Sequence, residues 1–83
     1  MSLTVVVQET ALRALARIRA DDKEAFALIR RALAALADQP RPDKAVPWGG
    51  SGNYRLRLPG IRILYEVDDD AAIVYVINVA VTM

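Results

Sequence analysis

The fold is decided by residues 54–67, which read YRLRLPGIRILYEV. On either side of Pro59-Gly60, apolar residues alternate with charged ones, as expected for two half-buried antiparallel strands. Proline followed by glycine favours a tight turn, because proline presets φ and glycine tolerates positive φ. The stretch therefore predicts a β-hairpin, with Tyr54–Leu58 as its first strand and Ile61–Val67 as its second.

A turn centred on Pro59-Gly60 places Arg57 opposite Arg62. Opposite residues of an antiparallel pair share a face and have Cβ atoms about 4.5–5.5 Å apart. Arg55 lies two residues before Arg57 and joins this face. The other face is almost wholly apolar and consists of Tyr54, Leu56, Leu58, Ile61, Ile63, Tyr65 and Val67. We expect that face to pack on helices and the arginine face to form a cationic patch.

Like charges directly opposite each other destabilise a sheet, within the roughly 0.2–1 kcal/mol scale of cross-strand pairs, so the arginines call for an explanation. Guanidinium groups bind phosphate oxygens of RNA or DNA bidentately and keep their charge at physiological pH. Carboxylates of a protein partner fit equally well. A structural alternative is that Glu66, diagonal to Arg55, and the acids of Asp68–Asp70 neutralise the arginines within the chain.

The segment before the hairpin predicts a strand followed by two antiparallel helices. Leu3–Val7 is a β-branched run of strand length, and Glu9–Arg19 has apolar residues at helical spacing. A carboxylate N-cap at Asp21, followed by Glu24, predicts the start of a second helix. That helix should end near Ala37, ahead of a proline.

The rest of the chain completes the predicted sheet. Pro40–Gly52 is rich in proline and glycine and predicts an irregular surface loop, with Trp48 against the body of the protein. Asp68–Asp70 predicts a turn. Ala72–Val81 has the composition of a central strand buried on both faces. The predicted fold is α+β with the order β-α-α-β-β-β: a helical hairpin on a small, mainly antiparallel four-stranded sheet, forming one domain over residues 1–83.

Composition narrows the possible chemistry. The chain has 83 residues, a formal net charge of +1, and neither cysteine nor histidine. Disulfides, thiol nucleophiles, imidazole bases and Cys/His metal sites are therefore excluded, and we expect no metal or cofactor. Affinity for nucleic acid must come from local clustering of charge. The 54% of hydrophobic residues reflects either alanine-rich helices or apolar surface that a partner covers.

The sequence also bears on cellular location and on one weaker motif. Residues 1–8 lack a basic region and a long apolar run, so we expect no signal peptide and a cytoplasmic protein. Gly49-Gly50-Ser51-Gly52 is rich in glycine, but it precedes a predicted strand and lacks the Lys-Ser/Thr of a phosphate-binding loop.

Taken together, the element order and two motifs resemble a known family. The motifs are the strand Tyr54–Leu58 and the run from Gly60 to Asp69, GIRILYEVDD. They are similar to the RelE/ParE superfamily of bacterial toxins from type II toxin–antitoxin systems. RelE-like members enter the ribosomal A site and cleave messenger RNA by attack of a 2′-hydroxyl on the adjacent phosphate. The resemblance implies a cognate antitoxin, the ribosome and mRNA as partners.

The resemblance also implies roles for individual residues. Arg55 and Arg57 occupy the two basic positions of the family's second strand, and Arg62 matches the arginine of the third. As catalytic residues they would bind phosphates and stabilise the charge that develops on the scissile phosphate. Arg41 and Lys44, in the preceding loop, are further RNA-binding candidates.

One departure from the family pattern keeps several functions open. RNA-cleaving members follow the last strand with a glycine, a basic pair and a tail with further catalytic groups, whereas this sequence reads Ala80-Val81-Thr82-Met83. We therefore expect a ribosome-dependent mRNA endoribonuclease with a reduced catalytic set. The alternatives are a ParE-like inhibitor of DNA gyrase that binds without catalysis, and a catalytically degenerate module that only binds an antitoxin.

Overall fold

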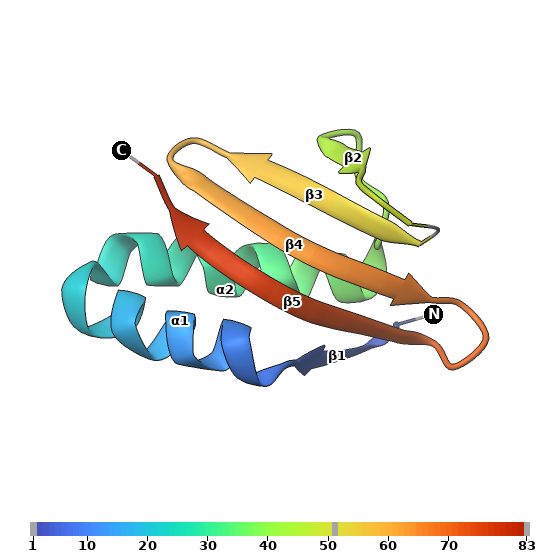
Figure 1. The fold of residues 1–83 in the computed structure, drawn as a ribbon, viewed down its shortest axis with the longest axis horizontal. Helices are drawn as coiled ribbons and strands as arrows, with labels where there is room; N and C mark the ends of the chain where they lie inside the picture. Colours follow the sequence, from blue (N-terminus) through green and yellow to red (C-terminus); the bar gives the residue numbers. More distant parts are fainter. Residues whose placement is uncertain (1, 51, 83) are drawn as a thin grey trace.

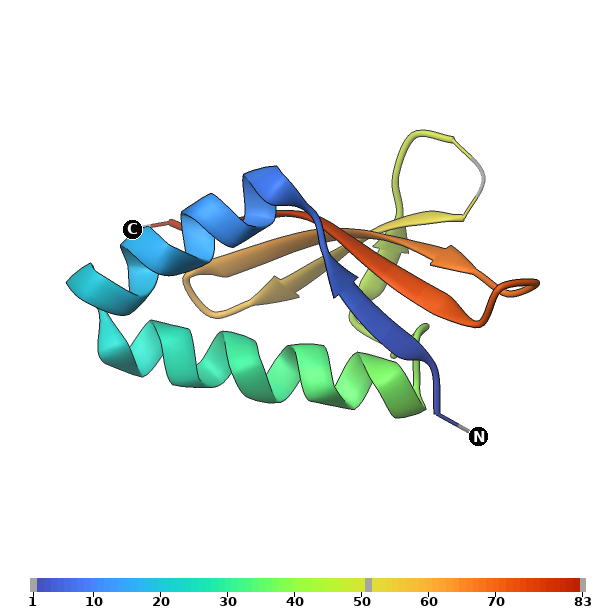
Figure 2. The same ribbon diagram turned by 90° about the horizontal axis from the view of Figure 1, so that it is seen from below.

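A computed structural model, which describes residues 2–50 and 52–82, has two helices packed against a five-stranded sheet (Figures 1 and 2). The elements in chain order are β1 (Thr4–Val7), α1 (Glu9–Asp21), α2 (Lys23–Asp38), β2 (Ala45–Pro47), β3 (Asn53–Leu58), β4 (Ile61–Asp68) and β5 (Ile73–Val81). The strand order across the sheet is β1-β5-β4-β3-β2. Strand β1 runs parallel to β5, and all other pairs are antiparallel.

The predicted hairpin and its register are confirmed. Leu58 pairs with Ile61, and Arg57 pairs with Arg62. Gly60 has a φ of +72°, which favours glycine. Its carbonyl accepts a hydrogen bond of 2.7 Å from the Thr82 N–H, and a Cβ at this position would lie 3.3 Å from the Thr82 carbonyl oxygen. Both the backbone conformation and this close approach therefore restrict the turn to glycine.

The two predicted helices are also confirmed, with one correction at their junction. Asp22, not Asp21, caps α2: its carboxylate accepts the Ala25 N–H at 3.1 Å. Asp21 is still the last residue of α1, and the Asp22 N–H donates to the Ile18 carbonyl at 2.7 Å. A single residue thus ends one helix and begins the next, which gives the tight antiparallel hairpin seen in Figure 2.

The core lies between the helices and one face of the sheet. The apolar face of the β3–β4 hairpin points into it, as predicted, and the opposite face, termed the open face here, has no helix over it in the described part of the chain (Figure 2). The buried residues are Ala11, Leu15, Ala25, Ile29, Leu33, Leu36, Leu56, Ile61, Ile63, Tyr65, Val67, Val74, Val76 and Val79.

The predicted number of four strands is wrong, because the segment predicted as an irregular loop contains β2. This strand pairs antiparallel with β3, with Val46 opposite Arg55. It is only three residues long, too short for apolar alternation to be recognised. Pro47 is tolerated because β2 is an edge strand, where an N–H directed away from the sheet has no ladder partner.

Strand β5 lies between β1 and β4, as predicted for a central strand, but it is not fully buried on both faces. Val74 and Val76 are buried against the helices, whereas Tyr75 on the open face is half-buried. A β-bulge interrupts the pairing with β4: Tyr65 pairs with Val76, but Leu64 pairs with Asn78. The extra residue changes the alternation, so that Asn78 joins the open face.

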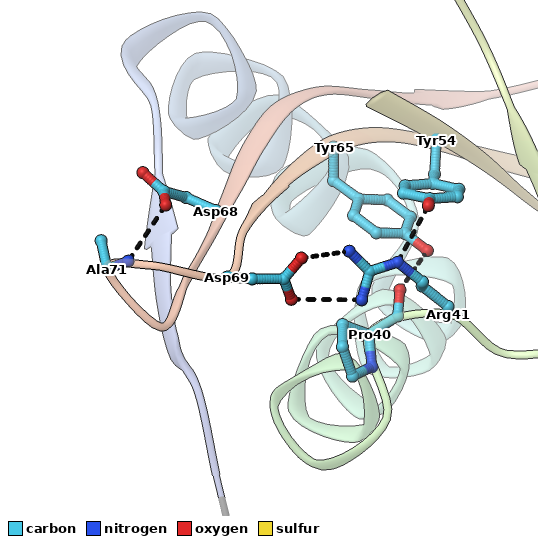
Figure 3. A network of polar contacts seen from close by, with 7 residues as sticks. All are labelled: Pro40, Arg41, Tyr54, Tyr65, Asp68, Asp69 and Ala71. Carbon is cyan, nitrogen blue, oxygen red and sulfur yellow. Dashed lines mark hydrogen bonds and ion pairs between the residues drawn. The ribbon is translucent and has the colours of Figure 1, made fainter. Parts of the chain in front are cut away.

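The buried Tyr65 joins the sheet to the end of α2. Its hydroxyl donates a 2.7 Å hydrogen bond to the Pro40 carbonyl, and its ring stacks on Tyr54 with centroids 5.7 Å apart (Figure 3). Burial raises the pKa of Tyr65 to about 12. The phenol therefore stays protonated and donates this bond throughout the physiological pH range.

Replacing Tyr65 with phenylalanine should lower the free energy of unfolding by about 1–2 kcal/mol, because the substitution removes the donor and leaves the Pro40 carbonyl unpaired. Urea denaturation measures this change. Tyr75→Phe is the matched control, since the Tyr75 hydroxyl has no hydrogen bond within residues 2–50 and 52–82. Equal stability of the two variants would contradict the assigned role of the Tyr65 hydroxyl.

Candidate functional site

The open face brings three arginines together, which we call the arginine trio: Arg55, Arg57 and Arg62. Arg57 and Arg62 are directly paired neighbours on β3 and β4, and Arg55 lies two residues from Arg57 on the same face. The side chains of Arg57 and Arg62 are exposed, while Arg55 is half-buried. The strands thus fix three cationic side chains on a face that the helices leave uncovered.

No acid of the described chain neutralises the arginine trio. The ion pairs among residues 2–50 and 52–82 are Arg13–Glu9 and Arg41–Asp69, each at 2.7 Å. Glu66 pairs across the sheet with Asn53 and Tyr75 in the strand ladders and makes no ion pair. The charge of the trio therefore remains available to an anion from outside the chain.

A cavity of about 220 Å³ lies beside the trio on the open face. It is lined by Trp48, Arg55, Arg62, Leu64, Asn78, Val79 and Ala80. The Nε atom of Arg55 is buried and has no hydrogen-bond partner within the described residues. An unpaired buried donor costs roughly 1–3 kcal/mol, more when it is charged, so this position of Arg55 is held at a cost in stability.

The structure separates the other two predicted RNA-binding residues from the arginine trio. The guanidinium of Arg41 binds both carboxylate oxygens of Asp69, at 2.7 and 3.3 Å, and its Nε donates to the Tyr54 hydroxyl at 2.9 Å (Figure 3). Tyr54 belongs to the helix-facing side of β3, so Arg41 lies away from the open face. Lys44 is exposed beside a groove between α2 and β3 that includes Leu58, also apart from the trio.

The Arg41–Asp69 contact is an internal charge pair. The hydrogen bonds that Arg41 donates to the Asp69 carboxylate raise the pKa of Arg41 and lower the pKa of Asp69. The pair joins the loop after α2 to the β4–β5 turn. Within that turn the Asp68 carboxylate accepts the Ala71 N–H at 3.0 Å, in agreement with the turn predicted there.

Sequence reasoning did not identify Trp48 and Asn78 as site residues. Trp48 was expected against the body of the protein, but its side chain is 44% exposed and lines the cavity. Asn78 reaches the open face only because of the bulge in β5. The face of Trp48 follows from β2, which is too short to be recognised in the sequence, and nothing in the sequence marks the bulge.

Two further properties concern the described residues only. Within residues 2–50 and 52–82, no helix has the length and apolar character needed to span a membrane. The same residues contain no cluster of three or more acidic side chains arranged to hold a metal ion.

The fold is similar to that of solved RelE-like structures. The isolated RelE toxin of E. coli is similar, with 21% identity, a TM-score of 0.85, and coverage of 99% of this chain and 86% of that one. The RelBE2 toxin–antitoxin complex of Mycobacterium tuberculosis gives 24% identity, a TM-score of 0.80, and coverage of 98% and 99%. The YoeB/ParE toxin from Agrobacterium tumefaciens is also similar, with 16% identity, a TM-score of 0.81, and coverage of 98% of this chain and 100% of that one.

The family follows from the sequence. A family model described as the ParE toxin of the type II toxin–antitoxin system parDE matches residues 5–81. The chain therefore belongs to the ParE toxin family, within the RelE/ParE superfamily, and is a toxin of a type II toxin–antitoxin system. No curated protein matches the sequence.

Replacing Arg57 with glutamine should leave stability unchanged or raise the free energy of unfolding by up to about 1 kcal/mol at low salt, because it removes the like charge opposite Arg62. Any gain should shrink as salt screens the repulsion. Urea denaturation at two salt concentrations measures the effect. Arg31→Gln on the exposed surface of α2 is the control, and a loss of stability specific to Arg57→Gln would show that the pair is not repulsive.

The Arg41–Asp69 pair makes stability depend on pH. Because the pKa of folded Asp69 lies below the unfolded value of about 3.9, its contribution is complete above that value and is lost as pH falls through the folded pKa. Asp69→Asn should therefore be less stable than the natural protein at pH 7, and the difference should disappear in acid. Urea denaturation across this range tests it, with Asp70→Asn as the control.

Proposed function

We propose that the protein is a cytoplasmic toxin that cleaves messenger RNA on the ribosome, with the arginine trio as its phosphate-binding and catalytic group. The observation that carries this proposal is a set of three arginines on the face of the sheet that the helices leave open, with no acidic partner among residues 2–50 and 52–82. Such a face offers bidentate donors to successive phosphates of a single strand.

The chemistry that suits this group is attack of an RNA 2′-hydroxyl on the adjacent phosphorus. The new bond joins the 2′-oxygen to phosphorus, and the bond from phosphorus to the 5′-oxygen breaks, which leaves a cyclic phosphate and a 5′-hydroxyl. Negative charge accumulates on the phosphate oxygens in the transition state. Arg55, Arg57 and Arg62 would stabilise that charge.

Arginine sets a limit on what the trio does. A guanidinium does not lose its proton near neutral pH, so none of the three serves as a general base. The trio itself therefore supplies charge and position, not proton transfer. Holding the message in a reactive geometry lowers the activation barrier of such a reaction considerably. A reduced catalytic set therefore fits a substrate that the ribosome has already positioned.

We further propose that a cognate antitoxin binds this protein, as in the M. tuberculosis toxin–antitoxin complex. The arginine trio fits carboxylates of such a partner. Apolar side chains also remain exposed on the helices, with Leu12 58% and Leu28 46% accessible. An antitoxin that covers these surfaces would account for the high hydrophobic content of a small domain.

Replacing Arg62 with alanine should reduce cleavage of message on programmed ribosomes by about 10²–10³-fold, as for loss of one positioned donor to a transition-state oxyanion. Arg31→Ala, on the outer surface of α2, should cleave at the natural rate. Primer extension on the recovered message locates and counts the cuts. Intact message at a large excess of the natural protein would rule out the nuclease.

The family match to a ParE toxin favours a second candidate, a protein that inhibits DNA gyrase by binding and needs no group for RNA cleavage. Pulse-labelling after expression of the toxin alone separates the two. Arrest of DNA synthesis while protein synthesis continues would favour the gyrase inhibitor. Normal growth would indicate a catalytically degenerate module that only binds an antitoxin.

A further inference from the structure

We propose that the cavity beside the arginine trio is a nucleobase subsite, in which Trp48 stacks on one base of single-stranded RNA while Arg55 and Arg62 bind its phosphate. The inference rests on the proposed function, since it specifies how the same face holds its RNA. Its central residue, Trp48, has no other role within the described structure.

The backbone holds Trp48 at the rim of this cavity. The Trp48 N–H donates a 2.9 Å hydrogen bond to the Asn53 carbonyl, which extends the β2–β3 pairing by one step beyond Pro47. Val46 pairs with Arg55, so Trp48, two residues further on, belongs to the same open face. Trp48 lines the cavity and is still 44% exposed. A large aromatic side chain is thus fixed with accessible ring surface beside two cations.

The size and walls of the cavity suit a single base. Its volume of about 220 Å³ lies below the roughly 300–1,000 Å³ of pockets for drug-sized ligands, and a planar heterocycle is smaller than those ligands. Leu64 contributes an apolar wall. The Oδ1 atom of Asn78 accepts the Val79 N–H at 2.9 Å, and the Asn78 amide NH₂ makes no hydrogen bond within the described residues. That NH₂ group is a donor for a ring nitrogen or carbonyl of the base.

The same cavity has a distinct anionic end. Arg55 and Arg62 both line it there, Arg55 as a half-buried side chain and Arg62 as an exposed one. An aromatic ring for the base and cations for the backbone form the combination by which proteins bind single strands. A peptide carboxylate would satisfy the arginines but would leave the Trp48 ring uncovered, so the combination favours a nucleotide.

Trp48 is the only tryptophan of the sequence, so its fluorescence reports on this cavity alone. Titration of the full chain with a hexameric RNA of adenosine should quench this fluorescence to saturation. An abasic hexamer with the same ribose-phosphate backbone should bind more weakly and quench little. Equal quenching by both oligomers, or no saturable quenching by the RNA, would overturn the subsite.

Affinity measurements on variants separate stacking from charge. Trp48→Ala should weaken binding of the RNA hexamer by about 5- to 150-fold, the range for loss of one stacked base, without changing the salt dependence. Trp48→Phe should recover most of the affinity. Arg62→Gln should weaken binding and also reduce the slope of log affinity against log salt by about 0.7.

Leu12→Ala is the matched control, because Leu12 is an exposed apolar residue on α1 outside the cavity, and it should bind RNA normally. Affinity of Trp48→Ala within twofold of the natural protein would contradict the proposal. These binding assays use no ribosome, so their outcome is independent of the outcome of the cleavage assay. Message cleavage with no stacking signal refutes the subsite alone, whereas stacking without cleavage refutes the nuclease alone.

Discussion

The register of the β3–β4 hairpin determines the rest of the structure. With Leu58 opposite Ile61, the apolar positions of both strands meet the helices and the arginine trio faces away from them. A slip by one residue would exchange the two faces of a strand. It would then bury guanidinium groups that have no partner in the core, at a cost of several kcal/mol for each ion. The alternation that builds the core therefore also holds the cationic face in place.

Two features beyond the hairpin give this face its detail. The bulge in β5 returns Val79 to the core and turns Asn78 outward, so one inserted residue serves both packing and the cavity. The short edge strand β2 then carries Trp48 to the other side of the cavity. The site is thus composed of the central trio and two flanking residues whose positions depend on departures from regular alternation.

The hairpin register depends on residues close in the sequence, whereas the bulge and the edge strand depend on pairing between distant segments. This difference explains how far the sequence could predict the structure. The Arg57–Arg62 pairing depends on a turn of adjacent residues, so local reasoning was sufficient, and the helices followed from their periodicity and caps. The bulge is a shift in the pairing register between β4 and β5, and the sequence of either strand alone does not indicate it. Arg41 is 28 residues from Asp69, so its capture by that carboxylate follows only from the folded chain. RNA binding by Arg41 stays a prediction, for a side chain that the fold pairs with Asp69.

The position of the acids reconciles a net charge of +1 with a cationic site. Asp69 is paired with Arg41 and Glu9 with Arg13, both away from the trio. Within the described part of the chain, ion pairs therefore involve cations outside the open face and none of the trio. A nearly neutral chain produces little long-range attraction, and salt screens charges beyond about 8 Å under physiological conditions. The trio consequently acts at contact distance. Such a face is better suited to a polyanion that another assembly has already brought into position than to one that long-range charge attracts from solution.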